Sequence, residues 1–170
     1  MIIRQASLAD LDAIHRIELE NFSPKEAISR EILAKHIETI STTFLVAEKN
    51  GKILGYLEGP IRPERHLHDV SFTMEIEDCH SIEGGFISLT SLSISKEAQG
   101  LGVGRALLEA MKEIAIADER HGINLTCHDY LTAYYERHDF VNEGQSKSTY
   151  ADEIWYDMVW DNPQSNCHKV

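Results

Sequence analysis

The 170-residue sequence has no apolar run that approaches the ~20 residues needed to cross a membrane. Its first five residues are too short and too polar for a secretory signal. Its three cysteines, Cys79, Cys127 and Cys167, show no CxxC spacing. This pattern indicates reduced thiols rather than a disulfide framework or a zinc site. We therefore expect a cytoplasmic protein with no metal centre.

Positive charge is scarce as well. Sixteen Lys and Arg residues stand against 28 Asp and Glu residues, for a net charge of −12. Nucleic acids and anionic membranes are bound by basic surfaces, so we expect neither as a partner. The acidic balance is compatible with a cationic substrate. With 42% hydrophobic residues, we expect one folded domain over residues 1–160 and a C-terminal tail over residues 161–170.

The first half of the chain has helical and then strand-like patterns. Ser7 and Asp10 have capping-box spacing, and apolar residues every third or fourth position predict a helix to about residue 21. A second helix is predicted over residues 29–40. Apolar runs at 43–48 and 52–58 flank Asn50-Gly51, which predicts an antiparallel hairpin. We interpret residues 59–85 as a long active-site loop with a short strand near 72–76.

The segment Phe86–Ile94 is predicted as a strand whose alternation slips by one residue. Apolar residues occupy odd positions at the start and even positions at the end, with the slip near Thr90-Ser91. Such a slip is typical of a β-bulge, and bulges often lie beside active sites. A helix to about residue 119, a strand at 123–127, a short helix at 131–138 and strands at 140–141 and 154–160 follow. This order predicts an α/β fold with a mixed sheet.

The strongest chemical signal is the glycine-rich segment Gln99–Arg105, which lies between a predicted strand and a predicted helix. Glycines allow the backbone to approach a bulky anion, and the N–H groups that start a helix bind phosphate. The spacing matches neither a Walker loop nor a dinucleotide-binding fingerprint. A turn that only connects strand and helix is the alternative.

The motif Gln99-x-x-Gly102-x-Gly104 resembles the [QR]-x-x-G-x-[GA] motif of the GNAT superfamily of N-acetyltransferases. Residues 125–129 and 134–140 resemble the superfamily's strand and Y-x-x-x-G-F segment. Residues 17–22 are similar to the first helix, and the loop after it, of the arylalkylamine (serotonin) N-acetyltransferase branch. The resemblance implies a mixed, mostly antiparallel sheet with a β-bulged, splayed central strand and helices on both faces. Asp139 replaces the usual glycine of the second motif, and aspartate tolerates the left-handed backbone region that a turn requires there.

The resemblance also implies acetyl-CoA as the cofactor. Its pyrophosphate would contact the glycine-rich loop, its pantetheine arm would contact the bulged strand, and a tyrosine would protonate the leaving thiolate. The tyrosine that corresponds to the acid is Tyr135, which would also contact the cofactor. The strand residues are Leu92, Ser93 and Ile94. The loop residues are Gln99, Gly100, Leu101, Gly102, Val103, Gly104 and Arg105.

The general base of the arylalkylamine branch does not carry over. Ser88 and Thr90 occupy the positions of its two strand histidines, and their hydroxyls can hold water but are not bases at neutral pH. Glu20, at the end of the first predicted helix, is the candidate carboxylate, with Glu18 beside it. The candidate substrate contacts are Phe22, Pro24 and His128.

The predicted function is transfer of an acetyl group from acetyl-CoA to the primary amine of a small molecule, either arylalkylamine-like or polyamine-like. Two alternatives stay open: a non-catalytic acyl-CoA-binding sensor, and a protein or peptide N-acetyltransferase. The apolar residues at 154–160 allow a homodimer.

Overall fold

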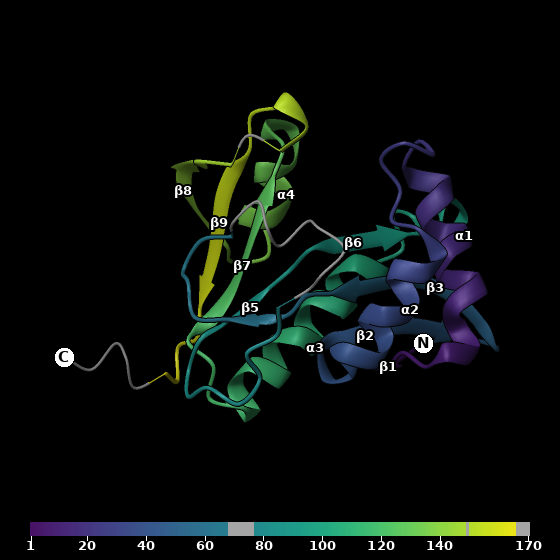
Figure 1. The fold of residues 1–170 in the computed structure, drawn as a ribbon, viewed down its shortest axis with the longest axis horizontal. Coiled ribbons are helices and arrows are strands. Elements are labelled where there is room, and N and C mark those ends of the chain that lie inside the picture. The colour runs from purple at the N-terminus through teal and green to yellow at the C-terminus, as the bar shows by residue number, and fades with distance from the viewer. Residues whose placement is uncertain (68–76, 149, 166–170) are drawn as a thin grey trace. The chain divides into compact units, whose positions relative to one another are not determined.

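The computed structural model describes residues 1–67, 77–148 and 150–165. Contacts group the chain into two compact units, residues 1–59 with 91–111 and residues 60–90 with 112–170 (Figure 1). The strand predicted near residues 72–76 and the cysteine at position 167 lie outside the described residues. None of the described helices is long and apolar enough to span a bilayer.

The first unit contains an antiparallel sheet in the order β1-β2-β3-β6. Its strands are β1 (Ile2–Gln5), β2 (Phe44–Lys49), β3 (Lys52–Glu58) and β6 (Ser91–Ile94). Asn50 and Gly51 both have positive φ angles, 53° and 78°, so the predicted tight hairpin between β2 and β3 is confirmed. β1 was not predicted from the sequence, because it is short and has no buried residue.

Two longer helices accompany this sheet, α1 (Leu11–Asn21) after a 3-10 turn, η1 (Leu8–Asp10), and α2 (Arg30–Thr39) before a second turn, η2 (Ser41–Thr43). The Ser7 N–H donates to Asp10 Oδ2 at 2.9 Å, as the capping-box spacing predicted. Arg4 adds two 2.8 Å hydrogen bonds to the same carboxylate. These bonds link β1 to the start of the helical segment.

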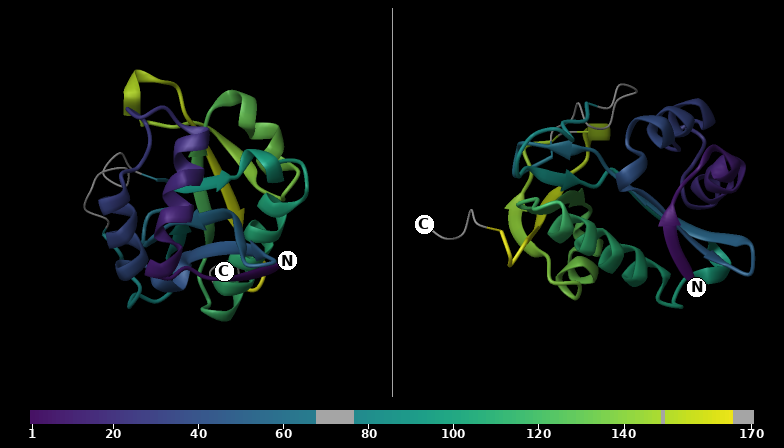
Figure 2. Two further views of the ribbon diagram at one scale, coloured as in Figure 1. Left: turned by 90° about the vertical axis from the view of Figure 1, so that its right-hand side faces the viewer. Right: turned by 90° about the horizontal axis from the view of Figure 1, so that it is seen from below.

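Helices lie on both faces of this sheet, because neighbouring residues of β3 contact different helices. The Tyr56 hydroxyl reaches Glu18 on α1, whereas a Cβ on Gly55 would lie 3.2 Å from Val103, the first residue of α3 (Val103–Ala117). Successive residues of a strand point to opposite faces. Figure 2 shows α1 and α2 together beside the strands β1 to β3.

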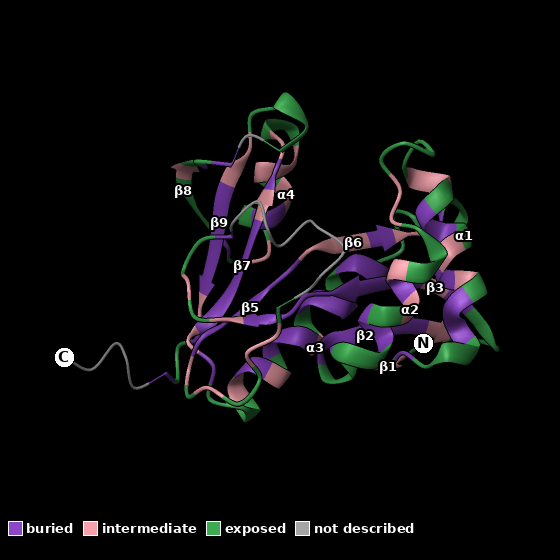
Figure 3. Cartoon of the chain, viewed as in Figure 1, coloured by how far each residue is buried: buried purple, intermediate pink, exposed green. Residues whose placement is uncertain are grey.

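The second unit contains a mixed sheet in the order β4-β5-β7-β9-β8. Its strands are β4 (Ile61–Arg62), β5 (Phe86–Ser88), β7 (Gly122–Cys127), β8 (Val141–Gln145) and β9 (Tyr156–Asp161), with short helical turns η5 (Asp129–Leu131), α4 (Thr132–Glu136) and η6 (Tyr150–Asp152). β5 and β7 are parallel, and the other neighbours are antiparallel. β7 and β9 are mostly buried, whereas β8 is mostly exposed (Figure 3).

The predicted bulged strand is interrupted. β5 ends at Ser88 and β6 begins at Ser91, and the two belong to different sheets. The Leu89 N–H still donates to the Asn124 carbonyl of β7 at 2.8 Å, so the change falls at Leu89-Thr90. The slip in alternation was therefore located correctly, but the strand is divided rather than continuous.

Lys112 of α3 is a buried cation within the second unit. Its Nζ donates to the His138 carbonyl at 2.6 Å and lies 5.8 Å and 5.6 Å from the ring centroids of Phe140 and Trp160.

The next residue after His138 is Asp139, whose φ of 69° confirms that aspartate adopts the left-handed conformation predicted for it.

Candidate active site

The glycine-rich loop follows β6 and a 3-10 turn, η4 (Lys96–Ala98), and leads into α3. Gly100 and Gly102 have φ angles of 78° and 82°, and a Cβ on either would meet no atom within 4 Å. The Ala106 N–H donates to the Gly102 carbonyl at 3.1 Å as the helix begins. The N–H groups of the preceding residues therefore have no partner within the helix. The backbone and the open space above it fit a phosphate group.

Gln99 fixes this loop to α1 and β6. Its Nε2 donates to Asn21 Oδ1 at 3.2 Å and to the Ile94 carbonyl at 3.3 Å. Asn21 Nδ2 in turn donates to Ser93 Oγ at 2.7 Å and to the Ile94 carbonyl at 2.8 Å. The glutamine of the motif thus has a positioning role that its spacing in the sequence does not reveal.

β6 is at one edge of its sheet, with β3 as its neighbour. An edge strand presents a row of backbone N–H and C=O groups that no strand pairs on the outer side. Leu92, Ser93 and Ile94 lie on this strand, immediately before the glycine-rich loop. Their position fits the predicted backbone contacts with an extended pantetheine arm.

A buried carboxylate lies where α1 faces β3 and β6. Glu18 is 2% exposed, and its Oε2 accepts a 2.8 Å hydrogen bond from the Ile28 N–H. Burial raises the pKa of Glu18, and the Ile28 and Tyr56 hydrogen bonds oppose that shift only in part. Glu20, the carboxylate expected from the sequence, is half-buried. Phe22 and Pro24 are exposed in the turn after α1.

A buried histidine also contacts a buried carboxyl group in this unit. His36 Nδ1 lies 2.8 Å and 2.9 Å from the two carboxylate oxygens of Glu58, and the side chains are 5% and 0% exposed. Nothing in the sequence pattern predicted this pair, because His36 and Glu58 are 22 positions apart.

Tyr135 belongs to α4 in the second unit and is 8% exposed. Its ring packs edge-on against Tyr134 and Phe140, with centroids 5.1 Å and 5.7 Å away. Burial raises the pKa of the Tyr135 hydroxyl, and Cys127 and Tyr134 nearby raise it further. The hydroxyl is therefore protonated at neutral pH, as a proton donor must be.

Ser88, Thr90 and His128 also belong to the second unit. Ser88 ends β5 at 1% exposure, and Thr90 is half-buried at the break before β6. His128 stacks on Tyr130 and Trp155, with centroids 5.3 Å and 4.3 Å away. Stacking on both partners fixes the imidazole beside the end of β7.

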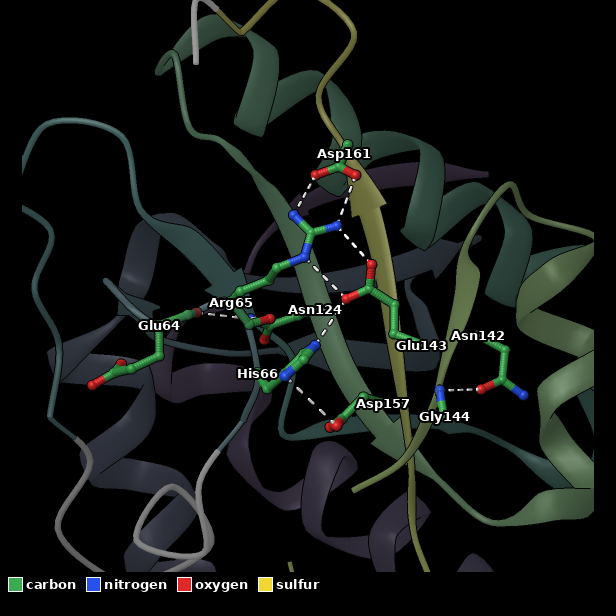
Figure 4. A network of polar contacts seen from close by, with 9 residues as sticks. All are labelled: Glu64, Arg65, His66, Asn124, Asn142, Glu143, Gly144, Asp157 and Asp161. Atoms are coloured by element: carbon green, nitrogen blue, oxygen red, sulfur yellow. Dashed lines mark hydrogen bonds and ion pairs between the residues drawn. The ribbon is translucent and has the colours of Figure 1, made fainter. Parts of the chain in front are cut away.

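A polar network that sequence reasoning missed covers one side of the second sheet (Figure 4). Arg65 forms paired hydrogen bonds with Glu143 at 2.9 Å and 2.7 Å, and with Asp161 at 2.8 Å and 2.9 Å. His66 Nε2 lies 2.8 Å from Glu143 Oε1. Hydrogen bonds from Arg65 and His66 lower the pKa of Glu143 to about 2.

Two histidines of the segment between β4 and β5 have carboxylate partners. His66 Nε2 contacts Glu143, and His80 Nδ1 lies 2.8 Å from Asp78 Oδ2. Within the described ranges, no group of three or more His, Cys, Asp or Glu residues is placed to hold a metal ion.

The chain matches the Acetyltransferase (GNAT) domain family over residues 10–160, and it belongs to that family. An uncharacterised N-acetyltransferase of Methanocaldococcus jannaschii is 31% identical over 112 residues, which cover 66% of this chain and 57% of the relative. The match thus spans little more than half of that relative's length.

Solved structures show the same fold. Chaetomium thermophilum Naa20, solved with a bisubstrate analogue, has a TM-score of 0.72 at 20% identity, covering 99% of this chain and 90% of its own. The GNAT-like decarboxylase GphF, solved with isobutyryl-CoA, has a TM-score of 0.78 at 15% identity. The match covers 95% of this chain and 100% of the GphF chain. The predicted α/β fold is confirmed, and so is the predicted membership of the GNAT acetyltransferase superfamily. The resemblance to the arylalkylamine branch stays a prediction.

Proposed function

We propose that the protein transfers the acetyl group of acetyl-CoA to the primary amine of a small molecule. The observation that carries the proposal is the glycine-rich loop, whose positive-φ glycines leave open space in front of the start of α3. Bound there, acetyl-CoA would supply the activated acetyl group. The residues proposed to hold it are those of the loop, Gln99–Arg105, and the edge strand residues Leu92, Ser93 and Ile94.

In this proposal Tyr135 provides the proton that the departing sulfur takes up. A thiol of pKa near 8.5 leaves more readily when it is protonated. The raised pKa of Tyr135 keeps that proton on the hydroxyl until it is needed. The residue's burial fits a donor that works away from bulk water.

An alkyl ammonium, with a pKa of about 10, must lose a proton before its nitrogen can attack. We propose that the hydroxyls of Ser88 and Thr90 hold the water that accepts this proton, and that Glu20 is a carboxylate base. Glu18, the other carboxylate that the sequence offered, is the second candidate, and burial raises its pKa in the direction that favours a base working near neutral pH. Phe22, Pro24 and His128 are the proposed substrate contacts.

The test is steady-state release of free CoA thiol from acetyl-CoA with arylalkylamines, polyamines, amino acids and short peptides. Turnover with small amines, and a kcat about a hundredfold lower in Tyr135→Phe, is the expected result. Tyr130→Phe is the matched control, because Tyr130 is 77% exposed. Preference for peptides would identify a protein N-acetyltransferase, and tight acetyl-CoA binding without turnover would identify a sensor.

We also propose that the protein is cytoplasmic and that it forms a homodimer. The dimer cannot form by edge pairing of β9, because β9 is hydrogen-bonded to β7 on one side and to β8 on the other. β8 is the edge strand, and its Val141 is 60% exposed. Analytical ultracentrifugation of the wild type and Val141→Lys would show whether this edge is used.

A further inference from the structure

Three side chains of the first unit form a continuous series of hydrogen bonds. Ser91 Oγ lies 3.0 Å from the Tyr56 hydroxyl, and that hydroxyl lies 2.5 Å from Glu18 Oε1. The three residues come from β6, β3 and α1, and we call them the Ser91–Tyr56–Glu18 series. The series leads from a half-buried serine at the start of a strand to a carboxyl group that is 2% exposed.

The ionised form of Glu18 fixes the direction of both hydrogen bonds in the series. A carboxylate can only accept, so the Tyr56 hydroxyl donates its one proton to Glu18. In its contact with Ser91, the Tyr56 oxygen is then the acceptor and the Ser91 hydroxyl is the donor. Ser91 Oγ keeps lone pairs that can accept a further proton. The series is therefore arranged to take up a proton at Ser91 and to deliver one to Glu18.

The surroundings of Glu18 suit a proton acceptor at the inner end of the series. Its other oxygen accepts from the Ile28 N–H at 2.8 Å. The titratable groups of β3 that act on it are Tyr56 and Glu58, and Glu58 is bonded in turn to His36 of α2. Burial first, and then the negative charge of Glu58, raise the pKa of Glu18, against two hydrogen bonds that lower it. A carboxylate of raised pKa is the stronger base.

The outer end of the series lies at the start of the strand that is proposed to hold the pantetheine arm. The glycine-rich loop, proposed to hold the pyrophosphate, follows the other end of β6. An arm that lies along Leu92, Ser93 and Ile94 would therefore run back from the loop toward Ser91. The acetyl group at the end of the arm, and the amine that attacks it, would lie within reach of the Ser91 hydroxyl.

We propose that Ser91 takes a proton from the ammonium group of the acceptor and passes one through Tyr56 to Glu18. The inference rests on the proposed function and adds two residues, Ser91 and Tyr56, that it did not use. One N–H bond of the ammonium breaks and its electron pair stays on nitrogen. The Ser91 hydroxyl gains that proton and gives its own to the Tyr56 oxygen, and Tyr56 gives its own to Glu18 Oε1. After acetyl transfer, the proton returns by the same path to water, because the amide product is not a base at neutral pH.

This relay makes the ammonium form of the acceptor a usable substrate. With the relay, kcat/KM for an alkylamine should be level between the pKa of Glu18 and the pKa of the amine, which is about 10. Without the relay only the free amine reacts, and at pH 7 that form is about one molecule in a thousand. We expect Ser91→Ala to lower kcat/KM by at least about a hundredfold at pH 7. The deficit should shrink by about tenfold for each unit of pH above 7, as the free amine becomes more abundant.

The measurement is release of CoA thiol from acetyl-CoA by the full chain, with 2-phenylethylamine and 1,4-diaminobutane as the acceptors. Profiles of kcat/KM from about pH 6 to about pH 9 are compared after subtraction of the uncatalysed rate. Tyr56→Phe and Glu18→Gln should show the same sloping profile as Ser91→Ala. Ser91→Thr keeps the hydroxyl and should keep the level profile of the wild type.

Thr43→Val is the control for the loss of a buried hydroxyl in the same unit. Its hydroxyl donates to the Gly59 carbonyl at 2.6 Å. The variant should lower the melting temperature, and its kcat/KM should stay in a constant ratio to that of the wild type at every pH. A structural defect thus lowers activity evenly, whereas loss of the relay lowers it most in the acid range.

Two results would overturn the relay and leave the acetyltransferase function standing. One is an active Ser91→Ala variant with the same profile as the wild type, and the other is a deficit of equal size at pH 7 and pH 9. A level profile in Glu18→Gln would also overturn it, because the proton would then go elsewhere. A wild type that acetylates neither these two amines nor any other would refute the proposed function itself, and the relay with it, because no reaction would need the proton path.

Discussion

The Tyr56 hydroxyl lies 2.5 Å from Glu18 Oε1 and 3.0 Å from Ser91 Oγ, so one phenol of β3 joins α1 to the first residue of β6. With Glu18 ionised, Tyr56 donates to it. With Glu18 protonated, Glu18 can donate to Tyr56, and Tyr56 can donate to Ser91. Either way the buried carboxyl keeps a partner, which is the condition for burying it at all.

Tyr56→Phe should lower the free energy of unfolding by about 1–3 kcal/mol, because Glu18 would be left buried with one donor fewer. The change should also raise the pKa of Glu18 further above its usual range. Urea denaturation at neutral pH measures the first effect. Tyr130→Phe, at an exposed tyrosine, should change stability by less than about 0.5 kcal/mol. Equal stability of Tyr56→Phe and wild type would show that Glu18 does not depend on this hydroxyl.

Gly102→Ala should weaken CoA binding by about tenfold or more, because a Cβ would enter the space in front of the loop where a phosphate has to lie close to the backbone. Gly51→Ala is a matched control. Gly51 has φ of 78°, close to the 82° of Gly102, and likewise has no atom within 4 Å of a built Cβ. Both variants should lose about 1 kcal/mol of stability. Equal CoA affinity of the two variants, measured by calorimetry, would argue against the loop as the phosphate site.

Glu143→Gln should destabilise the protein by about 1–2 kcal/mol at neutral pH and by less in acid. The pKa of Glu143 falls from 4.5 to about 2 on folding, because Arg65 and His66 bind the ionised form. A lowered folded pKa stabilises the fold above pH 4.5, and that contribution is lost as the pH falls toward 2. The difference between variant and wild type should therefore shrink over this interval. Glu136→Gln, at an exposed position of α4, should show no such pH dependence.

Cys127 should resist alkylation in the native protein. It is 3% exposed, and burial together with nearby Asp129 raises the pKa of its thiol to about 12. The thiolate is the reactive form, so little of it exists at pH 8. Cys79 is half-buried and should react with iodoacetamide before Cys127 does. Peptide mapping by mass spectrometry, before and after unfolding in guanidinium, measures both rates. Modification of Cys127 as fast as Cys79 would contradict its burial.

Local signals in the sequence predicted local structure well. The Asn50-Gly51 turn, the helix start at Ser7 and the left-handed Asp139 all follow from the conformational preferences of one or two residues. The glycine-rich segment was equally readable, because helix starts and positive φ angles have characteristic residue types. The alternation slip near Thr90 located the break between β5 and β6, although periodicity alone could not show that the two halves enter different sheets.

Contacts between distant positions were not predictable in this way. Arg65 meets Glu143 and Asp161 across 78 and 96 positions, and Asn124 meets the Arg65 carbonyl across 59. No pattern along the chain distinguishes these polar residues from solvated ones. The same applies to Glu18 and Glu20 at the end of α1: the periodicity placed both there, but only the packing of Tyr56 and Ile28 makes Glu18 the buried one.

The burial of Lys112 should protect its amine from chemical acylation, which matters in a family of proteins that use activated acyl groups. Thioesters slowly acylate lysine amines without an enzyme, and each event removes a positive charge. The Lys112 side chain is 7% exposed, with its Nζ bonded to the His138 carbonyl, whereas that of Lys52 is 52% exposed. Chemical self-modification should therefore accumulate on surface lysines such as Lys52 while sparing the one that lies against the rings of Phe140 and Trp160.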